Sequence, residues 1–253
     1  MKIGILGNSH VASLKQAWDR IGADHPTIEM VFFAHRGTQM SGMQAVAGKL
    51  VPDNPNLREA IIQVSGGRPE FDPAEYDAIV IYGLGASVFI FDEEGPYSKK
   101  VMTIAAENLA KNNVSYTLLE RLVGISSKPI YIGHNPFIAA YGAITHEGAE
   151  KYLASVERLN KLIYQPMGAR LLPQPPQSIV NGDKTDPIYA KGAPGLRVEA
   201  NAQDTRYPDH HRLHMNDAFG ELWLGQFLPL IETAPASTSA KRRHPKSRRG
   251  RPD

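Results

Sequence analysis

The chain has 253 residues, of which 42% are hydrophobic and 21% charged, which is enough to bury the core of one domain. It contains no cysteine, so disulfides, thiolate zinc sites and a cysteine nucleophile are excluded. No apolar run approaches the roughly 20 residues needed to span a bilayer, and the N-terminus lacks a signal-peptide pattern, so we expect a cytoplasmic protein without a membrane span.

The formal net charge of +2 comes from one end of the chain. Residues 233–253 hold seven Lys/Arg side chains against a single acid, Asp253, and are otherwise rich in Pro, Ser and Ala. Such a composition cannot bury a core. It predicts a domain over residues 1–232 followed by a disordered basic tail. The favoured interpretation is a solvated terminus without a partner. If nucleic acid or another acidic partner binds, we expect it to do so only through this tail.

Short apolar runs alternate with stretches of helical periodicity along the chain. This pattern is typical of a mostly parallel sheet with crossover helices on both faces. It predicts a three-layer, doubly wound α/β fold of the flavodoxin-like kind, with about five parallel strands. The predicted strands are 2–7, 28–34, 78–83, 129–133 and 169–173.

Four helical regions are predicted from apolar spacing and capping residues. The first follows the first strand, and the second covers 98–122 with a break at Asn112-Asn113. The third has apolar residues at helical spacing from Tyr152 to Ile163. The last follows Asn216, a favourable cap, and ends by Pro235.

Two stretches do not fit this alternation. Residues 38–72 and 174–208 contain clusters of Gly, Pro and Asn, which indicate irregular connections. Because long connections after the strands of an α/β sheet often shape the ligand pocket, we expect these two to form its walls.

Two short segments at opposite ends of the chain carry the residues of a serine hydrolase. Ser9 follows Gly7-Asn8 at the turn between the first strand and a helix, where backbone N–H groups and the positive helix end stabilise an oxyanion. His214 lies just before the last helix, and a histidine titrates near neutral pH as a general base requires. An open α/β sheet brings both to one edge.

These segments resemble the first and last sequence blocks of the SGNH or GDSL hydrolases, which include esterases, carbohydrate deacetylases and thioesterases. The resemblance covers most of residues 1–231 and implies Ser9 as the nucleophile and His214 as the base. Asn8 stands where the family usually has Asp. The family also has an Asp three residues before the base, and here that position is His211.

The group that orients His214 therefore remains open from the sequence. Asp209 is an anion close in sequence and is slightly favoured. His211 can orient the base only as a neutral hydrogen-bond acceptor. If a backbone carbonyl orients His214 instead, the enzyme works with a Ser–His dyad.

The resemblance also implies an oxyanion hole of the Ser N–H, a glycine after the second strand and an asparagine after the third. Gly37 fits the glycine. After the third strand the chain has no asparagine, so Gly85 is the candidate backbone donor, and Asn135 or Asn8 is a candidate replacement for the amide.

Other site types are less consistent with the sequence. Asp209 with His210, His211 and His214 offers metal-binding groups, but not at the spacing of the helical His pairs of metalloproteases. The chain has neither the three-glycine dinucleotide fingerprint nor a P-loop. We therefore expect no metal and no cofactor.

The sequence thus predicts a serine esterase or acyl hydrolase, with a carbohydrate O-deacetylase as one form. Its substrate is a small-molecule or carbohydrate ester. Two alternatives stay open: a non-catalytic binding protein on the same fold, and an O-acyltransferase with the same serine chemistry.

Overall fold

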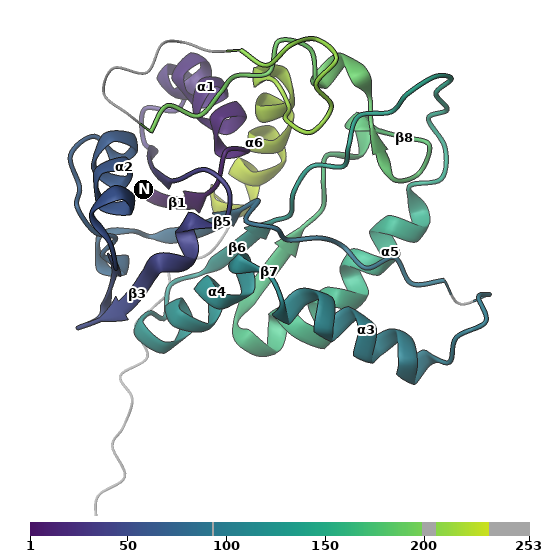
Figure 1. Ribbon diagram of the computed structural model, residues 1–253, viewed down its shortest axis with the longest axis horizontal. Coiled ribbons are helices and arrows are strands. Elements are labelled where there is room, and N and C mark those ends of the chain that lie inside the picture. The colour runs from purple at the N-terminus through teal and green to yellow at the C-terminus, as the bar shows by residue number, and fades with distance from the viewer. Residues whose placement is uncertain (93, 199–205, 233–253) are drawn as a thin grey trace, which may run out of the picture.

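The computed structural model describes residues 1–92, 94–198 and 206–232. Its centre is a parallel sheet in the order β2-β1-β5-β6-β7 (Figure 1). This confirms the predicted doubly wound α/β fold, and every strand agrees with its predicted range to within one residue at each end. The strands are β1 Lys2–Gly7, β2 Glu29–Ala34, β5 Ala78–Tyr82, β6 Ile130–Gly133 and β7 Ala169–Leu172.

The predicted basic tail, residues 233–253, and the predicted helix stop at Pro235 lie outside the described residues. Within the part that is described, no helix combines the length and apolarity needed to cross a membrane.

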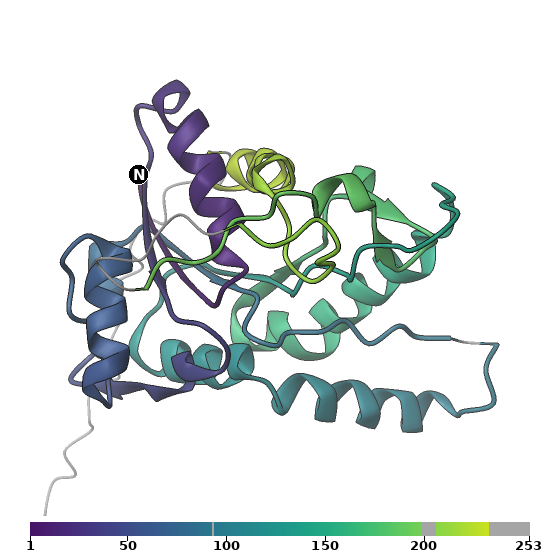
Figure 2. The same cartoon turned by 45° about the horizontal axis from the view of Figure 1, so that its top comes forward.

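Helices cover both faces of the sheet, as Figures 1 and 2 show. α1 (Val11–Ile21) and α6 (Asp217–Glu232) lie side by side on one face. α3 (Lys99–Lys111), α4 (Val114–Ile125) and α5 (Glu150–Leu159) cover the other. Because successive strand residues point to opposite faces, the strands supply apolar side chains to both core layers.

The predicted break near residue 112 separates α3 from α4. The Asn113 side chain accepts a hydrogen bond from the Tyr116 N–H at 2.9 Å and so caps the start of α4. α5 continues into a π-helical turn at Asn160–Tyr164. The Asn160 side chain donates to the Leu171 carbonyl at 2.9 Å and accepts from the Leu171 N–H at 2.7 Å, which ties this turn to β7.

The prediction of an irregular connection over 38–72 was wrong. This segment forms a hairpin of β3 (Met43–Val46) and β4 (Lys49–Pro52), followed by the helix α2 (Pro55–Ser65). Asn54 caps α2 by accepting from the Leu57 N–H at 2.9 Å, and the helix ends at a left-handed glycine. The Gly, Pro and Asn residues of this segment mark the ends of the helix. Its buried apolar residues have helical spacing and are Leu57, Ala60, Ile61 and Val64.

The connection over 174–208 is largely irregular in its described part. It contains the two-residue strands β8 (Ile179–Val180) and β9 (Lys184–Thr185) and two short 3-10 turns, Pro176–Ser178 and Pro187–Tyr189. Pro194 and Arg206 form an isolated bridge, and the Tyr207 N–H donates to the Ala193 carbonyl at 2.8 Å. These contacts return the chain to the sheet edge just before His214.

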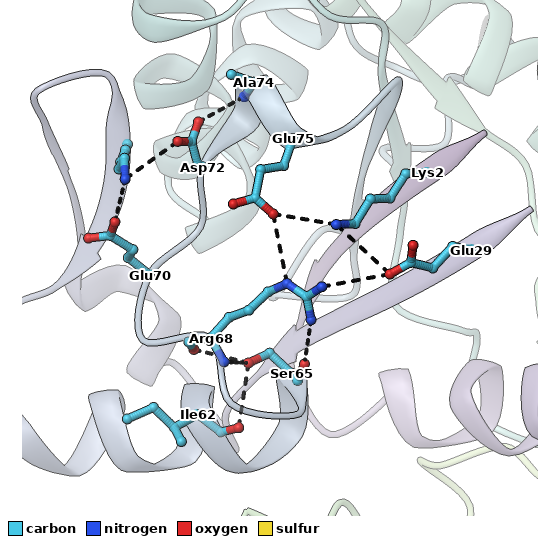
Figure 3. A network of polar contacts seen from close by, with 10 residues as sticks. Lys2, Glu29, Ile62, Ser65, Arg68, Glu70, Asp72, Ala74 and Glu75 are labelled. Atoms are coloured by element: carbon cyan, nitrogen blue, oxygen red, sulfur yellow. Dashed lines mark hydrogen bonds and ion pairs between the residues drawn. The ribbon is translucent and has the colours of Figure 1, made fainter.

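The amino ends of the strands carry a network of charged side chains (Figure 3). Lys2 lies 3.9 Å from Glu29 and 3.4 Å from Glu75, and Arg68 lies 3.7 Å from Glu29. Exposed pairs of this kind contribute about 0–1 kcal/mol each. The opposite edge, at the carboxyl ends, carries the histidines.

The close approach of α1 and α6 depends on a glycine. A Cβ atom at Gly220 would lie 2.2 Å from the Ser13 carbonyl oxygen, so any side chain there forces the helices apart. Arg20 on α1 adds ion pairs to Asp217 and, at 3.2 Å, to Glu221 on α6.

We predict that Gly220→Ala destabilises the protein by about 1–3 kcal/mol, because overpacking is forced against a backbone atom. The matched control is Gly225→Ala on the same helix, where a Cβ would meet nothing within 4 Å. We expect that control to raise the free energy of unfolding by about 0.5–1 kcal/mol through helix propensity. Urea denaturation measures both, and equal effects would contradict the packing argument.

Candidate active site

Ser9 lies in the turn between β1 and α1. The strand ends at Gly7, where a Cβ would lie 2.0 Å from Val11 Cγ2 and 2.8 Å from the Tyr82 carbonyl oxygen, so only glycine permits this turn. The turn is fixed further by Asn8, whose Oδ1 accepts from the His10 N–H at 3.1 Å. The Ser9 N–H has no hydrogen-bond acceptor among the described residues, and it lies at the positive end of α1.

His214 lies two residues before the cap of α6. The Asn216 Oδ1 accepts from the Phe219 N–H at 3.2 Å, which confirms the predicted cap. The Asn216 amide nitrogen also donates to the carbonyls of Ile188 at 2.9 Å and Lys191 at 3.1 Å. These bonds fix the start of the helix, and His214 Nε2 then lies 2.7 Å from Ser9 Oγ. Residues 205 positions apart in sequence are thereby within proton-transfer distance.

His211 is the residue that contacts the other ring nitrogen of His214. Its Nε2 lies 2.7 Å from His214 Nδ1. Asp209, which the sequence slightly favoured, is exposed and makes no hydrogen bond or ion pair with either ring within the described residues. When Ser9 donates its hydroxyl hydrogen to Nε2, the ring proton of His214 is on Nδ1 and is donated to His211.

Two further rings stack on His214. Tyr207 lies parallel to both members of the pair, with ring centroids 4.2 Å from His214 and 4.2 Å from His211. The His10 ring stacks on His214 at 4.7 Å, and its Nδ1 is buried without a hydrogen-bond partner. Tyr207 was missed by the sequence analysis, because nothing in the pattern around it signals a site.

Burial keeps these histidines neutral. Desolvation, followed by the charge of His211, lowers the pKa of His214 from 6.5 to about 4. Desolvation, followed by His214 and His211, lowers the pKa of His10 to about 3. The pKa of His211 is lowered too, by desolvation and then by His210. At pH 7 His214 is therefore unprotonated, the state in which it can accept a proton.

The predicted oxyanion donors lie at the same sheet edge but differ in their contacts. Gly37 is exposed after β2 and has φ +62. The N–H of Gly85 is already engaged, because it donates to Asn135 Oδ1 at 3.2 Å. This bond orients Asn135 and leaves its amide N–H groups without an acceptor among the described residues.

Asn8 and Asn135 meet at Gly83, which has φ +74. A Cβ at that position would lie 2.5 Å from Asn8 Oδ1 and 3.4 Å from Asn135 Oδ1. Two side-chain amides are thus gathered next to the turn that carries Ser9, although no asparagine follows the strand that usually supplies it.

The remaining histidines at this edge have other contacts. His134 is buried, and its Nε2 lies 2.7 Å from the Tyr152 hydroxyl. Within residues 1–92, 94–198 and 206–232, no three His, Asp or Glu side chains are grouped so as to hold a metal ion.

A cavity of about 320 Å³ lies between α1, α2 and residues 195–197, and one of about 470 Å³ lies between α2, the end of β2 and Val198. Gln63 lies in the walls of both. Both long connections that were expected to form pocket walls contribute to them, through residues 56–64 and 195–198. His35 and Arg36, at the carboxyl end of β2, line the larger one.

No family model matches the chain, and no curated protein matches its sequence. Among solved structures, the lipopolysaccharide acetyltransferase periplasmic domain of Salmonella ser. Paratyphi A is similar over 91% of this chain and 83% of that chain, with a TM-score of 0.42 and 12% identity. A likeness at this level bears on neither family nor chemistry, so the chemistry rests on the geometry of the site itself.

We predict that His10→Phe makes the protein more resistant to acid. Between pH 6.5 and about 4 the unfolded chain binds protons at His10 and His214 that the folded protein does not, so stability is lost as the pH falls. Each such histidine contributes up to about 1.4 kcal/mol per pH unit.

The phenylalanine keeps the stacking and removes one of these protonation sites. The free energy of unfolding of the variant, measured by denaturant titration at several pH values, should exceed that of wild type by a margin that grows below pH 6.5. If the free energies of unfolding of wild type and His10→Phe depend on pH in the same way, the fold does not hold His10 neutral.

Proposed function

We propose that this protein is a serine-dependent acyl-ester hydrolase, a divergent relative of the SGNH hydrolases. One observation carries the proposal: Ser9 Oγ, His214 Nε2, His214 Nδ1 and His211 Nε2 form a continuous chain with two contacts of 2.7 Å. This is the nucleophile, base and orienting group of a catalytic triad, with a neutral histidine as its third member.

In the first half-reaction, Ser9 Oγ attacks the carbonyl carbon of an ester. The hydroxyl proton passes to His214 Nε2 as the Oγ–C bond forms, and the carbonyl oxygen becomes an oxyanion. The bond from carbon to the alcohol oxygen then breaks, and Nε2–H returns the proton to the departing alcohol. An acyl-serine remains.

In the second half-reaction, water gives its proton to His214 Nε2 and attacks the acyl carbon. The ester bond to Ser9 breaks, Nε2 returns the proton to Oγ, and a carboxylic acid leaves. An alcohol that takes the place of water would give acyl transfer by the same steps.

The free N–H of Ser9 and the amide of Asn135 are the donors we assign to the oxyanion, with Gly85 orienting Asn135. We assign Gly37, on the exposed turn after β2, as a further donor, as the family resemblance implies. We assign the cavity lined by His35 and Arg36 to the alcohol part of a small-molecule or carbohydrate ester, because both residues directly precede Gly37 at the carboxyl end of β2.

We predict that the protein hydrolyses p-nitrophenyl acetate and that Ser9→Ala lowers kcat by at least about 10³-fold, since the nucleophile is lost. Ser87→Ala is the matched control, because Ser87 is an exposed serine at the same sheet edge, and it should retain wild-type turnover. Release of p-nitrophenol, followed by absorbance, measures both.

Equal turnover by wild type and Ser9→Ala would refute Ser9 as the nucleophile, and an absence of turnover by wild type would favour a binding protein. Mass spectrometry of the products with a sugar acceptor present separates the two enzymatic outcomes. Free acetate supports hydrolysis, and an acetylated sugar indicates an acyltransferase.

We predict that His211, and not Asp209, supports the base. His211→Ala should lower kcat by roughly 10–10³-fold, less than the ~10⁴-fold seen when the carboxylate of a serine protease triad is neutralised. Asp209→Asn should leave kcat unchanged, because that side chain is exposed and does not contact the pair.

The pH profile gives an independent measurement. For wild type, kcat/KM should be level from pH 8 to about 5 and fall as the pH passes about 4, where His214 becomes protonated. His211→Asp places an anion beside Nδ1–H and should move this fall to higher pH. A fall near pH 6.5 in wild type would contradict the assignment of the buried His214 as the base.

A further inference from the structure

Tyr207 has a position in the site that the proposed reaction does not yet explain. Its ring lies flat against the hydrogen-bonded histidine pair, with interplanar angles of 13° to His211 and 12° to His214. The two histidine rings are 4.9 Å apart, so the one tyrosine face covers both of them. Its hydroxyl lies 3.5 Å from His214 Nε2, the nitrogen that meets Ser9.

Among the described residues, no carboxylate forms a hydrogen bond or an ion pair with either ring of the pair. The titratable groups around His214 are His10 from the turn before α1, and His211 and Tyr207 from the segment before α6. His210 acts electrostatically on His211, and Arg36 from the end of β2 acts on Tyr207. No acidic side chain of the described residues pairs with either ring. The positive charge that forms on His214 during the proposed proton transfer is thus not paired with a carboxylate of residues 1–92, 94–198 or 206–232.

The face of an aromatic ring can supply part of that stabilisation. Its π electrons make it electronegative, and a cation within about 6 Å of the ring centroid is attracted to it. Both centroid distances to Tyr207 are 4.2 Å, and the face spans the 2.7 Å bond along which the charge is shared. His10 stacks on His214 too, but it is a histidine whose own charge would oppose that of His214.

We propose that Tyr207 is a positioning residue that stabilises the protonated His211–His214 pair with the face of its ring, in place of the missing carboxylate. The proposal rests on the proposed function only for its effect on turnover, because the charge on the pair can be measured without substrate.

The backbone holds Tyr207 in place for this role. Its N–H donates to the Ala193 carbonyl at 2.8 Å, and the preceding residue, Arg206, forms a bridge with Pro194 and bonds the Gly192 carbonyl at 2.6 Å. Tyr207 is therefore anchored through its backbone to residues 192–194, which lie outside the segment that carries the two histidines.

The test is an NMR titration of the ring nuclei of His214 in full-length wild type, Tyr207→Phe and Tyr207→Leu. Phenylalanine keeps the aromatic face and removes the hydroxyl, whereas leucine keeps an apolar cover and removes the face. We expect Tyr207→Phe to leave the pKa of His214 unchanged and Tyr207→Leu to lower it by roughly 0.5–1.5 pKa units.

The direction of the change separates the possible roles. If Tyr207 only shields the pair from water, the smaller leucine lets water in and raises the pKa of His214, which would overturn the proposal. If Tyr207→Phe lowers the pKa as much as Tyr207→Leu does, the hydroxyl acts rather than the ring face, and the proposal also fails. Thermal denaturation of each variant shows that the fold is retained.

Activity gives a second readout. With p-nitrophenyl acetate, kcat should fall about 10-fold in Tyr207→Leu and stay near wild type in Tyr207→Phe, with KM unchanged in both. If wild type and Ser9→Ala turn over equally, the proposed function fails. A lowered pKa in Tyr207→Leu would still support charge stabilisation by the ring.

Discussion

The site depends on the contact between α1 and α6. Ser9 lies two residues before the start of α1 and His214 three residues before the start of α6, so the distance between Ser9 Oγ and His214 Nε2 is set by how the two helices pack. The absence of a side chain at Gly220 lets α6 rest on the backbone of α1 at Ser13. A shift of the helices that lengthens this 2.7 Å contact beyond about 3.2 Å would take it out of the normal hydrogen-bond range. Packing between the first turns of the two helices therefore sets the distance between Ser9 Oγ and His214 Nε2.

In the proposed mechanism, the base His214 is oriented by a neutral histidine and contacts no carboxylate of the described residues. Burial against aromatic rings lowers the pKa of His214 to about 4, which keeps it ready to accept a proton in mildly acidic solution. The same burial makes His214 a weaker base, and a neutral His211 returns less stabilisation than a carboxylate would. In the proposed mechanism, His214 therefore has a weaker tendency to take the proton from Ser9, but it stays unprotonated over a wider range of pH.

Much of the framework follows from the sequence, because buried parallel strands are short apolar runs and the helix caps at Asn113 and Asn216 are local features. The helix α2 was missed because the Gly, Pro and Asn residues that mark its ends dominated the composition of 38–72. The choice between Asp209 and His211 could not be made, since it depends on how one turn aims two neighbouring side chains. Tyr207 was equally inaccessible, because only the closure of a loop at Ala193 brings its ring onto the histidines.

The separation of Ser9 and His214 by 205 positions has a consequence for how the site arises during synthesis. A nascent chain that has formed the first four strands of the sheet already holds the Ser9 hydroxyl and is about to add Asn135, but it does not yet contain His214. The Ser9–His214 contact forms only with the closing segment, once α6 packs against α1. Under the proposed function, a partly made molecule would therefore be inert toward esters.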